Sequence, residues 1–318
     1  MASRITSFEA NLEAAQRQYA DGFDTLRDQP GGTHELITQD LGALTGTSVN
    51  IGHVDPSAPV RVQRHGEAKI FDTPRAYGAT YDKETLYKAH ELSRDDLEFD
   101  HSGRVGRMIA AFLASDAKMF DERAWAKIVA NTDTGPDGVA LFSTAHPHGY
   151  AGATQANLVT DALSHTSFRT GMRAMPQFRR EDGSYYNTRA THLFVGPELE
   201  TTAKEIVGAD KPLAVDASGA EATSSVVAIT SIANVYQGEV TLVIVPEMDA
   251  DPDMWMLVDA SKPAKPFVRS IGANVAPVFG DKSNSDKARD RNMFDFIREG
   301  DWVFGPGAWQ CAYAGKPA

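Results

Sequence analysis

The chain has 318 residues, of which 42% are hydrophobic, and this is enough for one sizeable core or two modest ones. Its 31 basic and 43 acidic side chains give a formal net charge of −12, which excludes wrapping of nucleic acid by phosphate neutralisation. The single cysteine, Cys311, excludes an intrachain disulfide and suits a reducing compartment. We expect neither a signal peptide nor a membrane span, since no apolar run of the required length occurs.

The first predicted element is an amphipathic helix over residues 5–28. Its apolar positions recur every three or four residues and are Ile5, Phe8, Leu12, Ala15, Tyr19, Phe23 and Leu26. A Gln-Pro-Gly-Gly linker at residues 29–32 then ends the helix. Two interpretations stay open: the apolar stripe packs on its own core, or the helix is an arm that docks on a neighbouring subunit. In the second case the predicted interface residues are Phe8, Leu12, Tyr19 and Phe23.

A polar ribbon of extended strands is predicted over residues 58–82. Its apolar residues are too few for a buried face of its own, and an isolated two-stranded hairpin is marginal in water. The ribbon therefore lies on the core of this chain or reaches another chain. Arg61, Arg64 and Arg75 stand out in an acidic protein and predict charged contacts with another copy, although a solvated face is the plainer interpretation.

A long helix is predicted from about Ser102, its candidate cap, to Asn131. Its apolar residues form one stripe, and about 28 residues at a rise of 1.5 Å correspond to roughly 42 Å. That is longer than the usual globular helix of about 11–12 residues. A single-striped helix of this length is typical of a spine on which a flat domain is laid.

Residues 137–147, with the sequence DGVALFSTAHP, predict a fixed turn between two parts of the architecture. Asp137-Gly138 is turn chemistry, because glycine takes a positive φ without steric cost. The four apolar residues from Val139 to Phe142 predict one short buried strand. Pro147 is expected to stop that strand, since it donates no hydrogen bond.

The second half mixes short helices and short strands. Helices are expected at residues 166–175 and 198–207, and strands at 191–195, 225–229, 240–246, 255–258 and 267–269. The aromatic closing segments are 293–297, 302–304 and 309–313, which we expect in a core rather than a tail. This order indicates an α+β fold rather than regular βαβ winding.

Four segments in the same order resemble the major head (capsid) subunits of Mu-like phages and prophages. They are DGVALFSTAHP at 137–147 followed by Asn157-Leu158, THLFVGPELE at 191–200, WMLV at 255–258 with KPF at 265–267, and GDWVFG at 300–305 with WQ at 309–310. The resemblance covers most of the chain.

The resemblance implies an HK97-type capsid fold with five parts. These are an N-terminal arm (1–55), an extended loop or E-loop (56–98), a peripheral domain with the spine helix (99–190), an axial domain (191–280) and a C-terminal return to the peripheral domain (281–318). It implies neither enzymatic activity nor a cofactor, and no motif supports a covalent crosslink between subunits.

The implied function is self-assembly into an icosahedral virion shell that encloses DNA without sequence-specific binding and is assembled in the host cytoplasm. The expected partners are further copies in pentamers and hexamers, together with scaffold, maturation protease, portal and decoration proteins. The alternative is a soluble metal-dependent hydrolase using His146 and His148, which face the same side of an extended segment. His-Glu-x-x-His spacing and the Gly-x-Ser-x-Gly elbow around Ser143 are both missing from the sequence.

Overall fold

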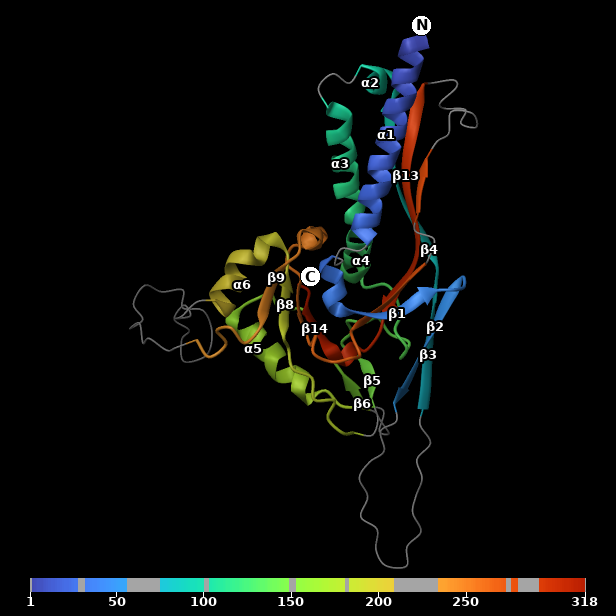
Figure 1. Ribbon diagram of the computed structural model, residues 1–318. Coiled ribbons are helices and arrows are strands. Elements are labelled where there is room, and N and C mark those ends of the chain that lie inside the picture. Colours follow the sequence, from blue (N-terminus) through green and yellow to red (C-terminus); the bar gives the residue numbers. More distant parts are fainter. Residues whose placement is uncertain are drawn as a thin grey trace, which may run out of the picture.

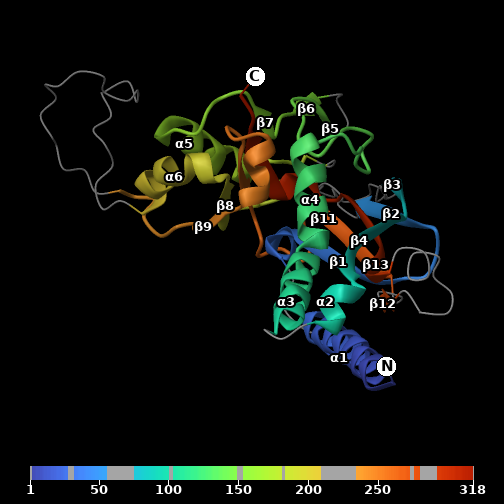
Figure 2. The ribbon, with the colours of Figure 1, turned by 90° about the horizontal axis from the view of Figure 1, so that it is seen from above.

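The computed structural model describes residues 2–27, 32–55, 75–99, 103–148, 153–180, 183–208, 234–272, 276–279 and 292–317. The fold is α+β and is built around two separate five-stranded sheets. Figures 1 and 2 show the helices α1 and α3 along one sheet, and α5 and α6 beside the other. Within these ranges, no helix is both long and apolar enough to cross a membrane.

The first sheet, here the spine sheet, is organised around one long strand near the C-terminus. Its strands are β1 (Thr38–Leu44), β11 (Phe267–Gly272), β13 (Met293–Pro306), β12 (Ala276–Phe279) and β4 (Glu84–Ser93). The antiparallel neighbours of β13 are β4 on one side and β11 and β12, in succession, on the other, and β1 adds in parallel to β11. The predicted closing segments 293–297 and 302–304 are thus two parts of one strand.

The helices of the spine sheet pack on its apolar face. They are α1 (Ala2–Arg27), α2 (Arg94–Glu98), α3 (Arg104–Ala117) and α4 (Met119–Ala130). An apolar cluster joins α1 and α3 to β4 and β13, and includes the buried side chains of Phe294 and Phe296. In Figure 1, α1 runs beside β13 over most of its length.

The prediction of one continuous spine helix is wrong, because α3 and α4 are separated at Lys118. The carbonyl of Ser115 accepts a hydrogen bond from the Lys88 ammonium at 2.8 Å. The neighbouring carbonyl of Asp116 accepts one from the Arg298 guanidinium. Helix-end carbonyls need such donors. At the other end, Ser102 lies outside the described residues and Gly103, at φ 64°, occupies the N-cap.

The second sheet holds the largest apolar core. Its order is β7 (Leu158–Val159), β14 (Ala312–Gly315), β10 (Trp255–Val258), β8 (His192–Val195) and β9 (Thr241–Ile244). The ring of Trp125 in α4 packs 5.6 Å from Phe194 on one face. On the other face Gly171 in α5 (His165–Ala174) lies against Leu257 and Tyr313. Together with α6 (Glu200–Val207), these helices exclude water from the central strand β10, whose four residues are all buried.

The remaining elements are two hairpins and short 3-10 helices. The ribbon is the pair β2 (Ser48–Asp55) and β3 (Arg75–Asp82), and a smaller pair is β5 (His146–His148) with β6 (Ala153–Gln155). The 3-10 helices are η1 (Thr33–Ile37), η2 (Met175–Gln177), η3 (Pro197–Leu199), η4 (Pro246–Ala250) and η5 (Trp309–Cys311).

Most of the strands predicted in the second half are confirmed, including those of β8, β9, β10 and β11. The strand predicted at 225–229 lies outside the described residues. The strand predicted from Val139 to Phe142 is wrong, because within the described residues 131–148 this run carries only a single bridge, between Thr134 and Ala140. Pro147 does not end a strand but lies inside β5, opposite Thr154.

Sheet membership divides the chain differently from the predicted boundaries. Strands β11 and β12 fall within the predicted axial range 191–280, yet they pair with β13 of the spine sheet. Strand β14 falls within the predicted C-terminal return, yet it pairs with β10 of the second sheet. The chain therefore crosses between the two sheets after β10 and again after β13.

Candidate functional site

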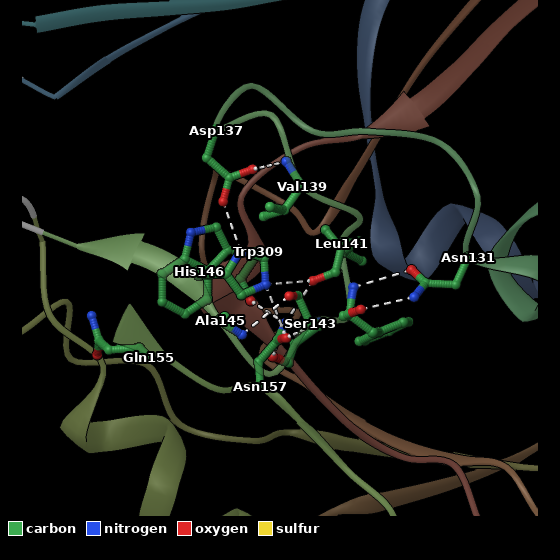
Figure 3. Close-up of polar contacts among 12 residues, drawn as sticks. Asn131, Asp137, Val139, Leu141, Ser143, Ala145, His146, Gln155, Asn157 and Trp309 are labelled. Carbon is green, nitrogen blue, oxygen red and sulfur yellow. Dashed lines mark hydrogen bonds and ion pairs between the residues drawn. The ribbon is translucent and has the colours of Figure 1, made fainter. Parts of the chain in front are cut away.

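The loop that follows α4 is closed by side-chain amides rather than by strand pairing. Asn131 ends α4 in the left-handed region at φ 49°, a conformation that asparagine tolerates. Its side chain donates to the Phe142 carbonyl at 2.8 Å and accepts from the Phe142 amide at 3.1 Å. Figure 3 shows this pair of hydrogen bonds pinning the apolar run from Val139 to Phe142. They satisfy the backbone of Phe142, which is buried together with Leu141 although the run forms no strand.

His146 is fully buried at the centre of this loop. Its Nδ1 lies 2.6 Å from the Asp137 carboxylate, while its Nε2 donates to the Leu141 carbonyl and to Asn157 Oδ1, both at 3.0 Å. The ring stacks on Trp309 with centroids 4.2 Å apart and planes 5° apart (Figure 3). Both ring nitrogens are therefore engaged within the protein, and neither faces an open site.

Asn157 connects the loop to the C-terminal segment. Its Nδ2 donates to the Leu141 carbonyl at 2.8 Å and, more weakly, to the carbonyls of Trp309 and Ala312 at 3.3 Å. Its Oδ1 also accepts from the Ser143 amide at 2.9 Å. Sequence reasoning placed Asn157 in a motif but assigned it no role, and its polar side chain between apolar neighbours was the available signal.

The hydrolase alternative finds no support in this geometry. The part of the chain that the structure describes contains no group of three or more His, Cys, Asp or Glu side chains that could hold a metal ion. The side chain of His148 lies outside that part. Ser143 Oγ accepts from the Ala145 amide at 3.1 Å, a local turn contact. Burial, followed by the nearby Asp259 charge, raises the pKa of the Cys311 thiol to about 12, which makes it a poor nucleophile.

Replacing Asn157 by leucine should lower the free energy of unfolding by about 1–3 kcal/mol, because it leaves buried donors and acceptors without partners. The loss should appear in urea unfolding followed by tryptophan fluorescence, since Trp309 stacks on His146. Asn50→Leu is the matched control, because Asn50 is exposed on β2. Equal stability of the two variants would contradict a structural role for the Asn157 network.

The predicted interface residues of the first helix are buried within the same chain. Phe8 packs 5.4 Å from Phe294, and Tyr19 packs 5.7 Å from Phe296. Leu12 and Phe23 are also buried. Of the two interpretations, packing on the chain's own core is what this structure shows, and a role of the stripe at an interface between copies stays a proposal. The physical reason is that the face of β13 toward α1 is itself apolar and complements the stripe.

Of the three arginines predicted at an interface, the structure describes only the backbone of Arg75. Arg75 is the first residue of β3 and pairs through its backbone with Asp55, whereas Arg61 and Arg64 lie outside the described residues. The ribbon begins at Ser48 and ends at Asp82, so β4, which fell within the predicted loop 56–98, belongs to the spine sheet instead. The base of the ribbon lies on its own chain, where Tyr81 joins Val268 and Val303 in a small buried cluster.

The chain is similar to viral shell proteins over most of its length. A family profile described as Phage capsid protein matches residues 78–314. A solved structure from Microbacterium phage Oxtober96 is 13% identical with a TM-score of 0.56, and the match covers 92% of each chain. No curated protein matches the chain significantly.

Two further solved structures share the fold. The procapsid of bacteriophage JBD30 is 16% identical with a TM-score of 0.53, over 97% of this chain and 76% of that chain. The asymmetric unit of the bacteriophage PhiM1 mature capsid is 12% identical with a TM-score of 0.55, over 91% and 88% of the two chains. The region that the family profile matches contains the second sheet, the spine sheet apart from β1, the helices α3 and α4, and most of the second strand of the ribbon.

Proposed function

The chain belongs to the phage capsid protein family and is a major capsid protein with an HK97-type fold, and we propose that it self-assembles into an icosahedral shell of pentamers and hexamers around DNA. The match to the family profile over residues 78–314 carries this proposal. Membership of the family makes the chain a structural protein rather than an enzyme. Its place in the virion follows from the same membership.

We further propose that the parts of the fold have the roles of an HK97-type subunit. The spine sheet with α3 and α4 corresponds to the peripheral domain, the ribbon to the E-loop, and most of the second sheet to the axial domain. The long central strand β13 and the projecting pair β2 and β3 support this assignment (Figure 1). Because β11, β12 and β14 cross the predicted boundaries, these domains are defined by sheet rather than by continuous sequence.

Contacts between copies are proposed to involve the arginines of the ribbon region. Arg61, Arg64 and Arg75 belong to a protein with a net charge of −12, so an acidic surface of another copy is the complementary partner. Individually weak contacts become strong when repeated around a closed shell. The acidic balance also limits adhesion of enclosed DNA, which is held without sequence-specific binding.

The group of phages, the place of assembly and the partner proteins are also proposals. The four motifs that resemble Mu-like head subunits support membership of that group, and assembly would take place in the host cytoplasm. A scaffold, a maturation protease and a portal are proposed as further partners of the shell. One solved relative is the capsid of bacteriophage JBD30 decorated with minor capsid protein trimers, which supports decoration proteins as further partners here.

The test is the size of the purified protein, measured by light scattering and negative-stain microscopy over a range of concentrations, with and without its scaffold. We expect rings of five or six copies, tubes or closed shells. Reversing the three charges with Arg61→Glu, Arg64→Glu and Arg75→Glu should abolish them, whereas replacing the same arginines by lysine should retain part of the assembly. A protein that stays monomeric under all these conditions would contradict self-assembly.

A further inference from the structure

The base of the ribbon is attached to the rest of the chain by a buried tyrosine. Tyr81, near the end of β3, donates from its hydroxyl to the Pro306 carbonyl at 2.8 Å and to the Thr134 carbonyl at 3.0 Å. These acceptors belong to the end of β13 and to the loop after α4. Burial, reinforced by the carboxylates of Asp133 and Asp137, raises the pKa of Tyr81, so the hydroxyl remains a donor.

The position of the Tyr81 ring depends on a glycine in β13. It lies against Gly305, and a Cβ atom at that glycine would stand 2.7 Å from three carbons of the ring. Real Cβ atoms do not approach so closely, so only glycine admits the ring here. The ring and the hydroxyl together hold the end of β3 against β13 and against the loop after α4.

Ion pairs attach Lys83 and Glu84, the residues that follow β3, to the spine sheet and to α4. The Lys83 ammonium lies 2.8 Å from the Asp301 carboxylate of β13. Glu84 accepts from Arg123 of α4 at 3.0 and 3.1 Å and lies 3.0 Å from Lys127. Burial alone would raise the pKa of Glu84, but these two cations lower it to about 2. The junction between β3 and β4 is therefore held to both β13 and α4.

A cavity of about 610 Å³ lies beside this attachment. It is lined by residues 78–82 of β3, by Glu84, Lys127 and Phe304, and by residues 132–136 and 138 of the loop after α4. Side chains do not fill this side of the ribbon, so packing there does not restrain its movement. The direction of the ribbon depends instead on Tyr81, on the apolar cluster that it forms with Val268 and Val303, and on the ion pairs that follow it.

We propose that Tyr81, whose ring packs against Gly305, is a positioning residue that sets the angle between the ribbon and the spine sheet. If the ribbon contacts another copy, as the proposed function requires, this angle determines where the contact falls. The attachment thus prepares the ribbon for assembly before any neighbour arrives. Such pre-organisation lowers the ordering cost of the contact.

The experiment measures the ribbon angle in the unassembled full-length chain. Spin labels are placed at Asn50→Cys on β2 and Ala126→Cys on α4, both exposed positions, and pulsed electron paramagnetic resonance reports the distance distribution between them. The native Cys311 is buried and does not compete for the label. We expect a narrow distribution for the otherwise unchanged chain and a broadened one for Tyr81→Phe, which removes only the hydroxyl. Gly305→Ala, which displaces the ring, should shift the mean distance.

Tyr87→Phe is the matched control, because it removes the hydroxyl of a tyrosine on β4 that is 70% exposed. It should leave the distribution unchanged. A merely stabilising role would lower the melting temperature of Tyr81→Phe without broadening the distribution, and that result would overturn the proposal. Because the measurement needs no shell, it stands even if the protein fails to assemble. Where the unchanged chain does form shells, Tyr81→Phe should yield aberrant particles under the same conditions.

Discussion

Replacing Trp125 by alanine should lower the free energy of unfolding by about 3–5 kcal/mol, the range for large aromatic residues in a core. Trp125 is fully buried on α4, where its ring packs 5.6 Å from Phe194 of the second sheet. Its indole Nε1 donates to Thr33 Oγ1 at 2.8 Å. The substitution removes this apolar contact and this hydrogen bond together, so α4 loses part of its packing on the second sheet and its hydrogen bond to η1.

Urea unfolding monitored by circular dichroism measures this loss without depending on the missing tryptophan. Trp125→Phe should recover part of the stability, since it restores most of the ring volume but not the hydrogen bond. Tyr87→Ala serves as the control, because that side chain is largely exposed on β4. A loss well below about 1 kcal/mol for Trp125→Ala would mean that α4 does not anchor the second sheet.

Helical periodicity predicted the amphipathic helices because that signal is local. The break at Lys118 could not be predicted in the same way, since residues 115–119 contain neither proline nor glycine. The break is stabilised by Lys88 and Arg298, which reach the carbonyls of Ser115 and Asp116 from strands that are distant in sequence. A helix whose continuity depends on such contacts looks continuous when only its own sequence is considered.

The stretch from Val139 to Phe142 shows the limit of apolar runs as strand signals. A run of this kind identifies burial but not the partner of its backbone, and here Asn131 binds both the amide and the carbonyl of Phe142. In the same way, the sequence does not reveal the partners of His146, whose ring binds Asn157 and stacks on Trp309. Sequence motifs indicated a phage capsid protein, which the family profile confirms, whereas the contacts that join this loop to the C-terminal segment appear only in the structure.

The second large loss of stability is expected from the apolar stripe of α1. Replacing Phe8 and Tyr19 together by alanine should destabilise the chain by roughly 6–10 kcal/mol, because the two sites are far enough apart for losses of about 3–5 kcal/mol each to add. Phe8 contacts Phe294, while Tyr19 contacts Phe279 and Phe296 and donates from its hydroxyl to the buried Asp116. The sum approaches the whole stability of an ordinary domain, which is about 5–15 kcal/mol.

Undocking of α1 sets an upper limit on this loss, because once the helix leaves the spine sheet its side chains no longer contribute. Removing residues 1–28 therefore gives the limiting value in the same urea titration. Glu13→Ala with Arg17→Ala, on the exposed face of α1, is the matched control and should cost little. If the double alanine variant and the truncation both lost less than about 1 kcal/mol, the stripe would not be docked on its own chain in solution. The apolar side chains predicted at the interface would then be free to contact a neighbouring copy. That result would support the interpretation of α1 as an arm. These side chains are Phe8, Leu12, Tyr19 and Phe23.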